Sequence, residues 1–143
     1  HTFIYRRTET HTSGNPLAHA ILRGATNKHG NAIPNYHFED LELLLEKYEH
    51  AGLKNPAAIV DTNHSNSNKK YEQQPRIAHE VLHSRLYDPR IRKLVKGLMI
   101  ESYLEPGNQK IGCGTHIYGK SITDPCLGWA ESERLIYEIA ERC

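Results

Sequence analysis

The chain has 143 residues, of which 38% are hydrophobic, a net charge of +1 and a mean hydropathy of −0.66. This length suits one domain with a core of its own. Basic residues are spread along the chain and no apolar run reaches membrane-spanning length, so we expect neither a nucleic acid nor a membrane as partner. The three cysteines lack CxxC spacing and no signal peptide is visible at the start, which favours a cytoplasmic location.

The first part of the chain is predicted to be extended. Residues 1–16 are rich in Thr and Arg and end in a turn cluster of Ser, Gly, Asn and Pro, which predicts an exposed hairpin arm. Residues 19–24 predict a short strand that closes on Arg23. Residues 25–34 contain two glycines and no apolar periodicity, so we expect a polar loop there.

The middle of the chain predicts two helices around a buried strand. Residues 38–51 place apolar side chains on one helical face and glutamates on another, with Gly52 as terminator. Residues 57–60 form a short apolar run that is typical of a buried strand and leads directly to a polar loop. Pro75 suits the first turn of a second helix, which should end before Asp88.

The last part of the chain predicts one more strand and helix. Residues 95–100 form the third strand, residues 105–128 a long connection, and residues 131–141 a helix expected to bury Leu135, Ile136 and Ile139. Strands that alternate with helices predict an α/β fold with a parallel sheet.

Charged side chains follow each of the three predicted strands. Arg23, His64 and Glu101 stand at or just beyond the strand ends, and the long connection adds Asp124. Because parallel strands bring their carboxyl ends to one edge, we expect these side chains to converge. Any one of them alone is more often an ordinary solvated side chain, but the set of His, Glu and Asp suits Mn²⁺, Fe²⁺ or Zn²⁺. Arg23 suits a phosphate or carboxylate. Three lysines are further candidates for phosphate contact, although a solvated surface position is their default: Lys69, Lys70 and Lys120.

A competing motif leaves a zinc peptidase open as an alternative. His79, Glu80 and His83 match HExxH, in which two histidines on one helical face bind zinc and the glutamate acts as base. Ten histidines in this chain make a chance match plausible, and no further ligand stands at metzincin spacing.

Nearly the whole chain resembles the type I 3-deoxy-D-arabino-heptulosonate-7-phosphate (DAHP) synthases, and only the first dozen residues match poorly. The shared motifs occur in the same order. They are Gly14-Asn15, Ile21-Leu22-Arg23-Gly24, Pro34-Asn35-Tyr36, Asp61, His64-Ser65-Asn66-Ser67, Ile100-Glu101-Ser102, Glu105, Gly107-Asn108-Gln109, Tyr118-Gly119-Lys120-Ser121-Ile122-Thr123-Asp124 and Cys126-Leu127-Gly128-Trp129.

The resemblance implies a TIM (β/α)₈ barrel that condenses phosphoenolpyruvate with erythrose 4-phosphate, the first step of the shikimate pathway to aromatic amino acids. It implies that His64, Glu101 and Asp124 bind a divalent metal ion (Mn²⁺, Fe²⁺, Co²⁺ or Zn²⁺). Arg23 would bind the phosphate of phosphoenolpyruvate, and Arg23 and His64 would be the catalytic residues. Cys126 matches a different cysteine from the metal-binding one of the family, which belongs to an early strand.

The chain is too short for the whole barrel, which takes about 250 residues. We expect residues 17–143 to be barrel strands 6–8 with their helices, after the arm at residues 1–16. Such a partial barrel exposes sheet edges and an apolar face, so we expect a homo-oligomer or association with the missing N-terminal half. The chain alone should be inactive. A non-catalytic truncated half-barrel or interaction module stays open as an alternative.

Overall fold

Three parallel strands form the central sheet of the computed structural model, which describes residues 2–112 and 114–143. His1 of the expected arm and Cys113 of the cysteine set lie outside the described residues. The sheet order is β3-β6-β7, with β6 in the middle. The strands are β3 (Ala20–Leu22), β6 (Ala58–Asp61) and β7 (Val95–Met99). The alternation of strands and helices confirms the predicted mixed α/β fold.

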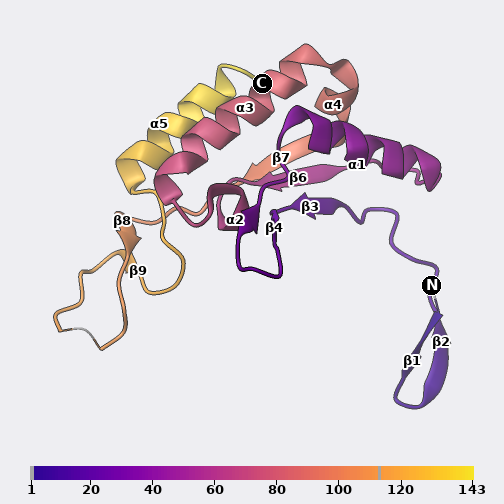
Figure 1. Ribbon diagram of the computed structural model, residues 1–143, viewed down its shortest axis with the longest axis horizontal. Helices are drawn as coiled ribbons and strands as arrows, with labels where there is room; N and C mark the ends of the chain where they lie inside the picture. Colours follow the sequence, from indigo (N-terminus) through magenta and orange to yellow (C-terminus); the bar gives the residue numbers. More distant parts are fainter. Residues whose placement is uncertain (1, 113) are drawn as a thin grey trace.

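Helices cover one face of this sheet, as Figure 1 shows. They are α1 (Phe38–His50), α3 (Gln74–Tyr87), α4 (Pro89–Leu94) and α5 (Trp129–Ala140). The expected helices at residues 38–51 and 131–141 and the helix that Pro75 opens are confirmed to within two residues at each end.

The core lies between the helices and the sheet. Ala58 and Val60 of β6 are fully buried against this layer, together with Ile77 of α3. The opposite face of the sheet has no helical cover in the described part of the chain (Figure 1), and Ile21 and Met99 are 45% and 37% exposed. Because successive side chains of a strand point to opposite faces, each strand divides its apolar residues between a packed and an open side.

One expectation about the helices is wrong, and the sequence does not predict helix α4. Ile136 is 61% exposed, because α5 turns only Leu135 and the half-buried Ile139 toward α3. Helix α3 ends before Asp88 as expected, and α4 begins directly after it. The Asp88 side chain accepts a hydrogen bond from the backbone amide of Arg90 at 2.7 Å, so Asp88-Pro89 both ends α3 and caps α4.

Several short elements surround the sheet. The chain begins with an antiparallel hairpin that stands apart from the helices in Figure 1. A second hairpin occupies the segment expected to be a loop after Arg23, and a parallel pair organises the long connection before α5. These strands are β1 (Thr2–Tyr5), β2 (Thr8–His11), β4 (Ala25–Thr26), β5 (Ala32–Ile33), β8 (Glu105–Asn108) and β9 (Lys120–Ser121). Among the described helices, none has the length and apolar character needed to cross a bilayer.

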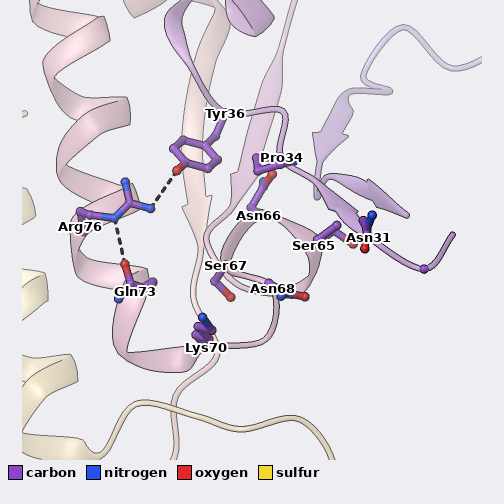
Figure 2. Close-up of a pocket in the computed structure, with 12 residues that line it drawn as sticks. Asn31, Pro34, Tyr36, Ser65, Asn66, Ser67, Asn68, Lys70, Gln73 and Arg76 are labelled. Atoms are coloured by element: carbon purple, nitrogen blue, oxygen red, sulfur yellow. Dashed lines mark hydrogen bonds between the residues drawn. The ribbon is translucent and has the colours of Figure 1, made fainter. Parts of the chain in front are cut away.

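The segment after β5 is anchored to α3 by a side-chain contact. Arg76 donates a hydrogen bond to the hydroxyl of the buried Tyr36 at 2.9 Å (Figure 2). Tyr36 and Arg76 line a hollow with a volume of about 580 Å³, and Lys70 also lines it. The Arg76–Tyr36 bond therefore ties the segment that follows the β4–β5 hairpin to α3.

The packing of α3 leads to a first prediction. Replacing Ile77 by Ala should lower the free energy of unfolding by about 2–5 kcal/mol, because it leaves a cavity between the helix and the sheet. Leu86→Ala in the same helix is the control: Leu86 is 60% exposed and its loss should cost less than about 0.5 kcal/mol. Urea unfolding followed by circular dichroism measures both variants. Equal losses would contradict the described core.

The cap of α4 leads to a pH-dependent prediction. Hydrogen bonds from Arg90 hold the pKa of Asp88 below its ordinary value of 3.8. A carboxyl whose folded pKa is depressed stabilises the fold above its unfolded pKa, and this contribution is lost as the pH falls through the lower, folded value. Asp88→Asn should therefore be less stable than the unmodified chain near neutral pH, with a difference that shrinks as the pH falls below 3.8. A pH-independent difference in urea midpoint would contradict this.

Candidate metal centre

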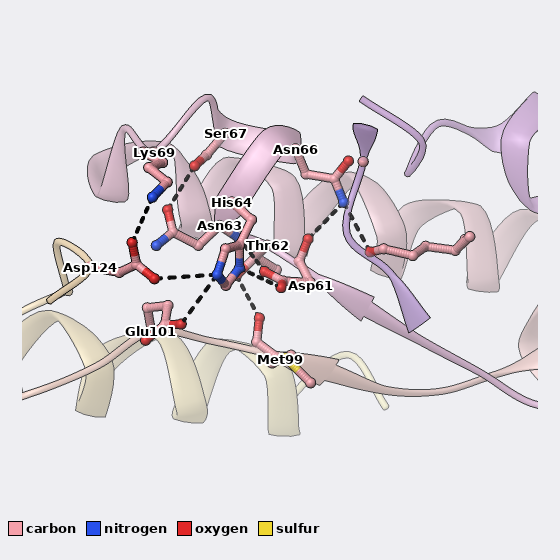
Figure 3. A network of polar contacts seen from close by, with 12 residues as sticks. Asp61, Thr62, Asn63, His64, Asn66, Ser67, Lys69, Met99, Glu101 and Asp124 are labelled. Carbon is pink, nitrogen blue, oxygen red and sulfur yellow. Dashed lines mark hydrogen bonds and ion pairs between the residues drawn. The ribbon is translucent and has the colours of Figure 1, made fainter. Parts of the chain in front are cut away.

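A buried carboxylate at the end of β6 orients His64. Asp61 is 1% exposed, and its Oδ2 accepts a hydrogen bond from Nδ1 of His64 at 2.7 Å (Figure 3). The other carboxylate oxygen of Asp61, Oδ1, accepts a hydrogen bond from the backbone N–H of Asn63 at 2.8 Å. An ionised carboxylate only accepts hydrogen bonds, so this contact favours the tautomer with the proton on Nδ1, in which the Nε2 lone pair can bind a metal ion. This is how proteins commonly orient a metal-binding imidazole.

A buried glutamine fixes Glu101 beside this histidine. Gln74, the first residue of α3, is fully buried. Its side chain accepts from the Glu101 amide at 2.8 Å and donates to the Glu101 carbonyl at 2.9 Å. The Thr62 hydroxyl, just beyond β6, donates to the same glutamine oxygen at 3.0 Å. The ends of β6 and β7 therefore share one polar anchor.

The loop that carries Asp124 closes over the same strand ends. The Asn63 side chain donates to the Pro125 carbonyl at 3.2 Å, and the Leu127 amide donates to the Glu101 carbonyl at 2.9 Å. These bonds bring a residue that lies 60 positions beyond His64 in the sequence next to its ring.

His64, Glu101 and Asp124 converge as the sequence predicted. Nε2 of His64 lies 3.3 Å from Oδ2 of Asp124 and 4.0 Å from Oε1 of Glu101 (Figure 3). One ligand atom of each residue lies within 4.8 Å of the others, and all three side chains are partly buried. One imidazole nitrogen and two carboxylate oxygens suit Mn²⁺, Fe²⁺, Co²⁺ or Zn²⁺. The group is therefore a candidate metal centre.

Two neighbours shape the electrostatics of this group. Lys69 forms an ion pair with Asp124, with Nζ 2.9 Å from Oδ1, and lowers the pKa of Asp124 although partial burial opposes the shift. Burial raises the pKa of the Cys126 thiol, which donates to the Asp124 carbonyl oxygen at 3.3 Å. A thiol kept protonated is a poor ligand, which agrees with leaving Cys126 out of the metal site.

Arg23 lies beside this group rather than in it. It follows β3, is exposed, and lines a hollow of about 420 Å³ together with His64 and Lys69. The Asn66 side chain joins the two strand ends by donating to the carbonyls of Leu22 and Asp61 at 3.0 and 2.7 Å.

The close approach of these segments also depends on Gly24. It has φ +72°, and a Cβ there would lie 2.7 Å from that of Ser65. A side chain would therefore push the Arg23 segment away from His64.

Two of the three HExxH residues pair with other side chains. Nε2 of His79 lies 2.8 Å from a carboxylate oxygen of Glu138 on α5, and Glu80 pairs with Arg76 at 3.0 Å. Within residues 2–112 and 114–143, these side chains form no group of three potential ligands, so the zinc-peptidase alternative lacks a site there.

Taken together, these features define an α/β protein with a candidate divalent-metal centre and a basic hollow at the carboxyl ends of parallel strands. The sequence profile of the DAHP synthetase I family matches residues 3–136. The chain therefore belongs to the DAHP synthetase I family, which confirms the resemblance found in its motifs.

Curated relatives and a solved structure agree with this assignment. The chain is 42% identical over 131 residues to the Trp-sensitive phospho-2-dehydro-3-deoxyheptonate aldolase of Enterobacter agglomerans, covering 91% of the chain and 35% of the relative. The phospho-2-dehydro-3-deoxyheptonate aldolase of Haemophilus influenzae is 37% identical, and the match covers 91% of this chain and 34% of that relative. The aldolase structure from Francisella tularensis SCHU S4 superposes with a TM-score of 0.81 and 28% identity, covering 99% of this chain and 40% of that one. The chain spans about a third of the length of these curated relatives.

Sequence reasoning assigned no role to Asp61 or Gln74. Asp61 and His64 lie three residues apart across a strand end, and this spacing could have suggested that Asp61 orients the His64 ring. No comparable signal marks Gln74, whose partner Glu101 lies 27 residues away.

The orientation of His64 leads to a prediction for metal binding. Asp61→Asn should weaken Mn²⁺ binding by about 10–100-fold, because an amide nitrogen facing Nδ1 favours the tautomer with its proton on Nε2. Asp40→Asn is the matched control, since Asp40 faces Nδ1 of His37 at 3.3 Å with the same spacing in the sequence but away from the metal centre. Titration of Mn²⁺ followed by electron paramagnetic resonance measures both. An unchanged affinity in Asp61→Asn would contradict the orienting role.

Proposed function

We propose that this chain is the C-terminal portion of a 3-deoxy-7-phosphoheptulonate synthase, which condenses phosphoenolpyruvate with erythrose 4-phosphate in the first step of aromatic amino acid biosynthesis. The convergence of His64, Glu101 and Asp124 within 4.8 Å carries the proposal, because it occurs in a chain of the DAHP synthetase I family. The names of the relatives, phospho-2-dehydro-3-deoxyheptonate aldolases, support the same reaction.

We also propose that residues 17–143 are strands 6–8 of a (β/α)₈ barrel and that residues 1–16 are an arm outside it. Three parallel strands with helices on one face are the unit from which such a barrel is built. The open face, with Ile21 and Met99, would be the barrel interior. The missing strands would come from an N-terminal portion, or a second copy would cover the open face.

The residues of the site suit defined parts of this reaction. A divalent cation bound by His64, Glu101 and Asp124 would polarise the aldehyde oxygen of erythrose 4-phosphate. Arg23 would hold the phosphate of phosphoenolpyruvate in the adjacent hollow and so align C3 with the aldehyde carbon. Asp61 would keep the proton of His64 on Nδ1. A bond then forms between C3 of phosphoenolpyruvate and C1, the aldehyde carbon of erythrose 4-phosphate. Water adds to C2 of the former phosphoenolpyruvate, and phosphate leaves as the bond between C2 and its bridging oxygen breaks.

A second candidate function is a non-catalytic half-barrel or interaction module. The observation that favours it is the length of the chain, about a third of that of its curated relatives. The family's cysteine ligand and most of its phosphate-binding residues would lie in the remaining two thirds.

An activity assay separates the two functions. The chain alone, with both substrates and Mn²⁺, should show no turnover, and adding the N-terminal portion of a related synthase should restore it. In the complemented protein, His64→Ala and Glu101→Gln should each abolish metal-dependent turnover, because each removes one metal ligand.

His83→Ala is the control for this experiment, because His83 is exposed on α3 and belongs to the HExxH motif. Turnover in this variant should equal that of the unmodified protein. Full activity of Glu101→Gln at saturating Mn²⁺ would reject the metal assignment, and no turnover after complementation would favour the non-catalytic function.

A further inference from the structure

Lys69 lies between the candidate metal centre and the hollow beside Arg23. Its Nζ is 2.9 Å from Oδ1 of Asp124, while the other oxygen of that carboxylate faces His64 (Figure 3). The same lysine lines the hollow that Arg23 lines. One side chain thus belongs to the surroundings of both a metal ligand and an anion-binding residue.

The backbone of Lys69 is fixed while its side chain reaches into solvent. Its amide donates to the His64 carbonyl at 2.8 Å, and both Asn68 and Lys69 adopt left-handed φ values of +54° and +58°. Such conformations are unfavourable for residues other than glycine and persist only where the surroundings impose them. The side chain is 63% exposed, so its ammonium group can move without disturbing the turn.

The hollow itself suits an oxyanion. None of its lining residues is acidic, and Thr26, Ser65 and Asn68 offer hydroxyl and amide donors. Within the part of the chain that the structure describes, the Arg23 side chain forms no hydrogen bond or ion pair with another residue. A doubly charged anion held there by Arg23 would also attract Lys69.

The ion pair with Asp124 opposes metal binding. Lys69 neutralises the carboxylate that a metal ion needs, and a divalent cation on Oδ2 would share that carboxylate with a second positive charge. Metal binding is therefore favoured when Lys69 turns elsewhere.

We propose that Lys69 couples the two sites by exchanging partners: it pairs with Asp124 in the free protein and with a phosphate-like dianion in the hollow when that anion is bound. The exchange releases Asp124 to the metal ion, so anion and metal strengthen each other's binding. This inference rests on the proposed function, because it requires the metal centre and the anion-binding hollow to exist.

The test is the affinity for Mn²⁺ with and without sulfate, measured by electron paramagnetic resonance on the 143-residue chain at neutral pH. Sulfate is a tetrahedral dianion, and chloride at equal ionic strength is the reference. In the unmodified chain, sulfate should tighten Mn²⁺ binding at least about fivefold. Lys69→Met and Lys69→Gln should bind Mn²⁺ more tightly than the unmodified chain in chloride, and sulfate should change their affinity by less than about twofold.

Two further variants separate charge from structure. Lys69→Arg keeps the cation and should keep the response to sulfate. Lys70→Met removes the positive charge of the neighbouring residue, which lines the hollow beside Tyr36 and Arg76 (Figure 2). Its affinity for Mn²⁺ and its response to sulfate should equal those of the unmodified chain. Far-UV circular dichroism checks that each variant is folded.

Two results would overturn the inference in distinguishable ways. If the unmodified chain binds Mn²⁺ but Lys69→Met and Lys69→Gln respond to sulfate as it does, the coupling through Lys69 is wrong and the metal centre stands. If the unmodified chain does not bind Mn²⁺ at all, the coupling is overturned together with a metal site formed by this chain's residues alone, whereas the proposed function is decided separately by turnover after complementation.

Discussion

The hydrogen bond between His64 and Asp61 is the constraint on which the site depends. The imidazole ring can offer its Nε2 lone pair to a metal ion held with Glu101 and Asp124 only while Nδ1 carries the proton, and the buried carboxylate favours this tautomer. Burying Asp61 costs free energy unless its oxygens accept hydrogen bonds, and the His64 ring and the Asn63 amide supply them. The requirement for a stable fold and the requirement for an oriented ligand are therefore met by the same bond.

The buried polar side chains around this bond connect the strand ends into one unit. Asn66 joins β3 to β6, Gln74 joins β6 to β7, and Asn63 joins β6 to the Asp124 loop. Each of these three side chains is at least 96% buried and hydrogen-bonded. Partial satisfaction of such groups is costly, so alternative arrangements of the loops are disfavoured. This explains how residues far apart in the sequence hold a site whose atoms lie a few ångströms apart.

The sequence predicted what depends on local patterns and missed what depends on tertiary partners. Local apolar patterns were enough for α1, α3 and the strand containing Val60. Strand ends and the long connection were enough to predict that His64, Glu101 and Asp124 converge. Ile136 was misplaced because 3.6-residue periodicity does not decide between adjacent positions at the edge of an apolar face.

The anchoring residues were harder to predict. Gln74 reads as an ordinary polar residue at a helix start, since its role exists only after β6 and β7 pair. The β4–β5 hairpin lacks apolar alternation, because it is held by contacts to α2 (His64–Ser67) rather than by a buried face of its own. The segment that follows it is tied to α3 through Tyr36.

The open face of the sheet connects the fold to the proposed function. A parallel sheet is normally covered on both faces, because its strands carry apolar residues on each side. Here the face with Ile21 and Met99 is exposed, and both β3 and β7 present an unpaired edge in the described part of the chain. In a closed barrel, the same edges pair with further strands and the same face becomes the packed interior. The metal centre and the basic hollow lie at the rim of that face, so completing the barrel would also enclose the site and bring further ligands to it.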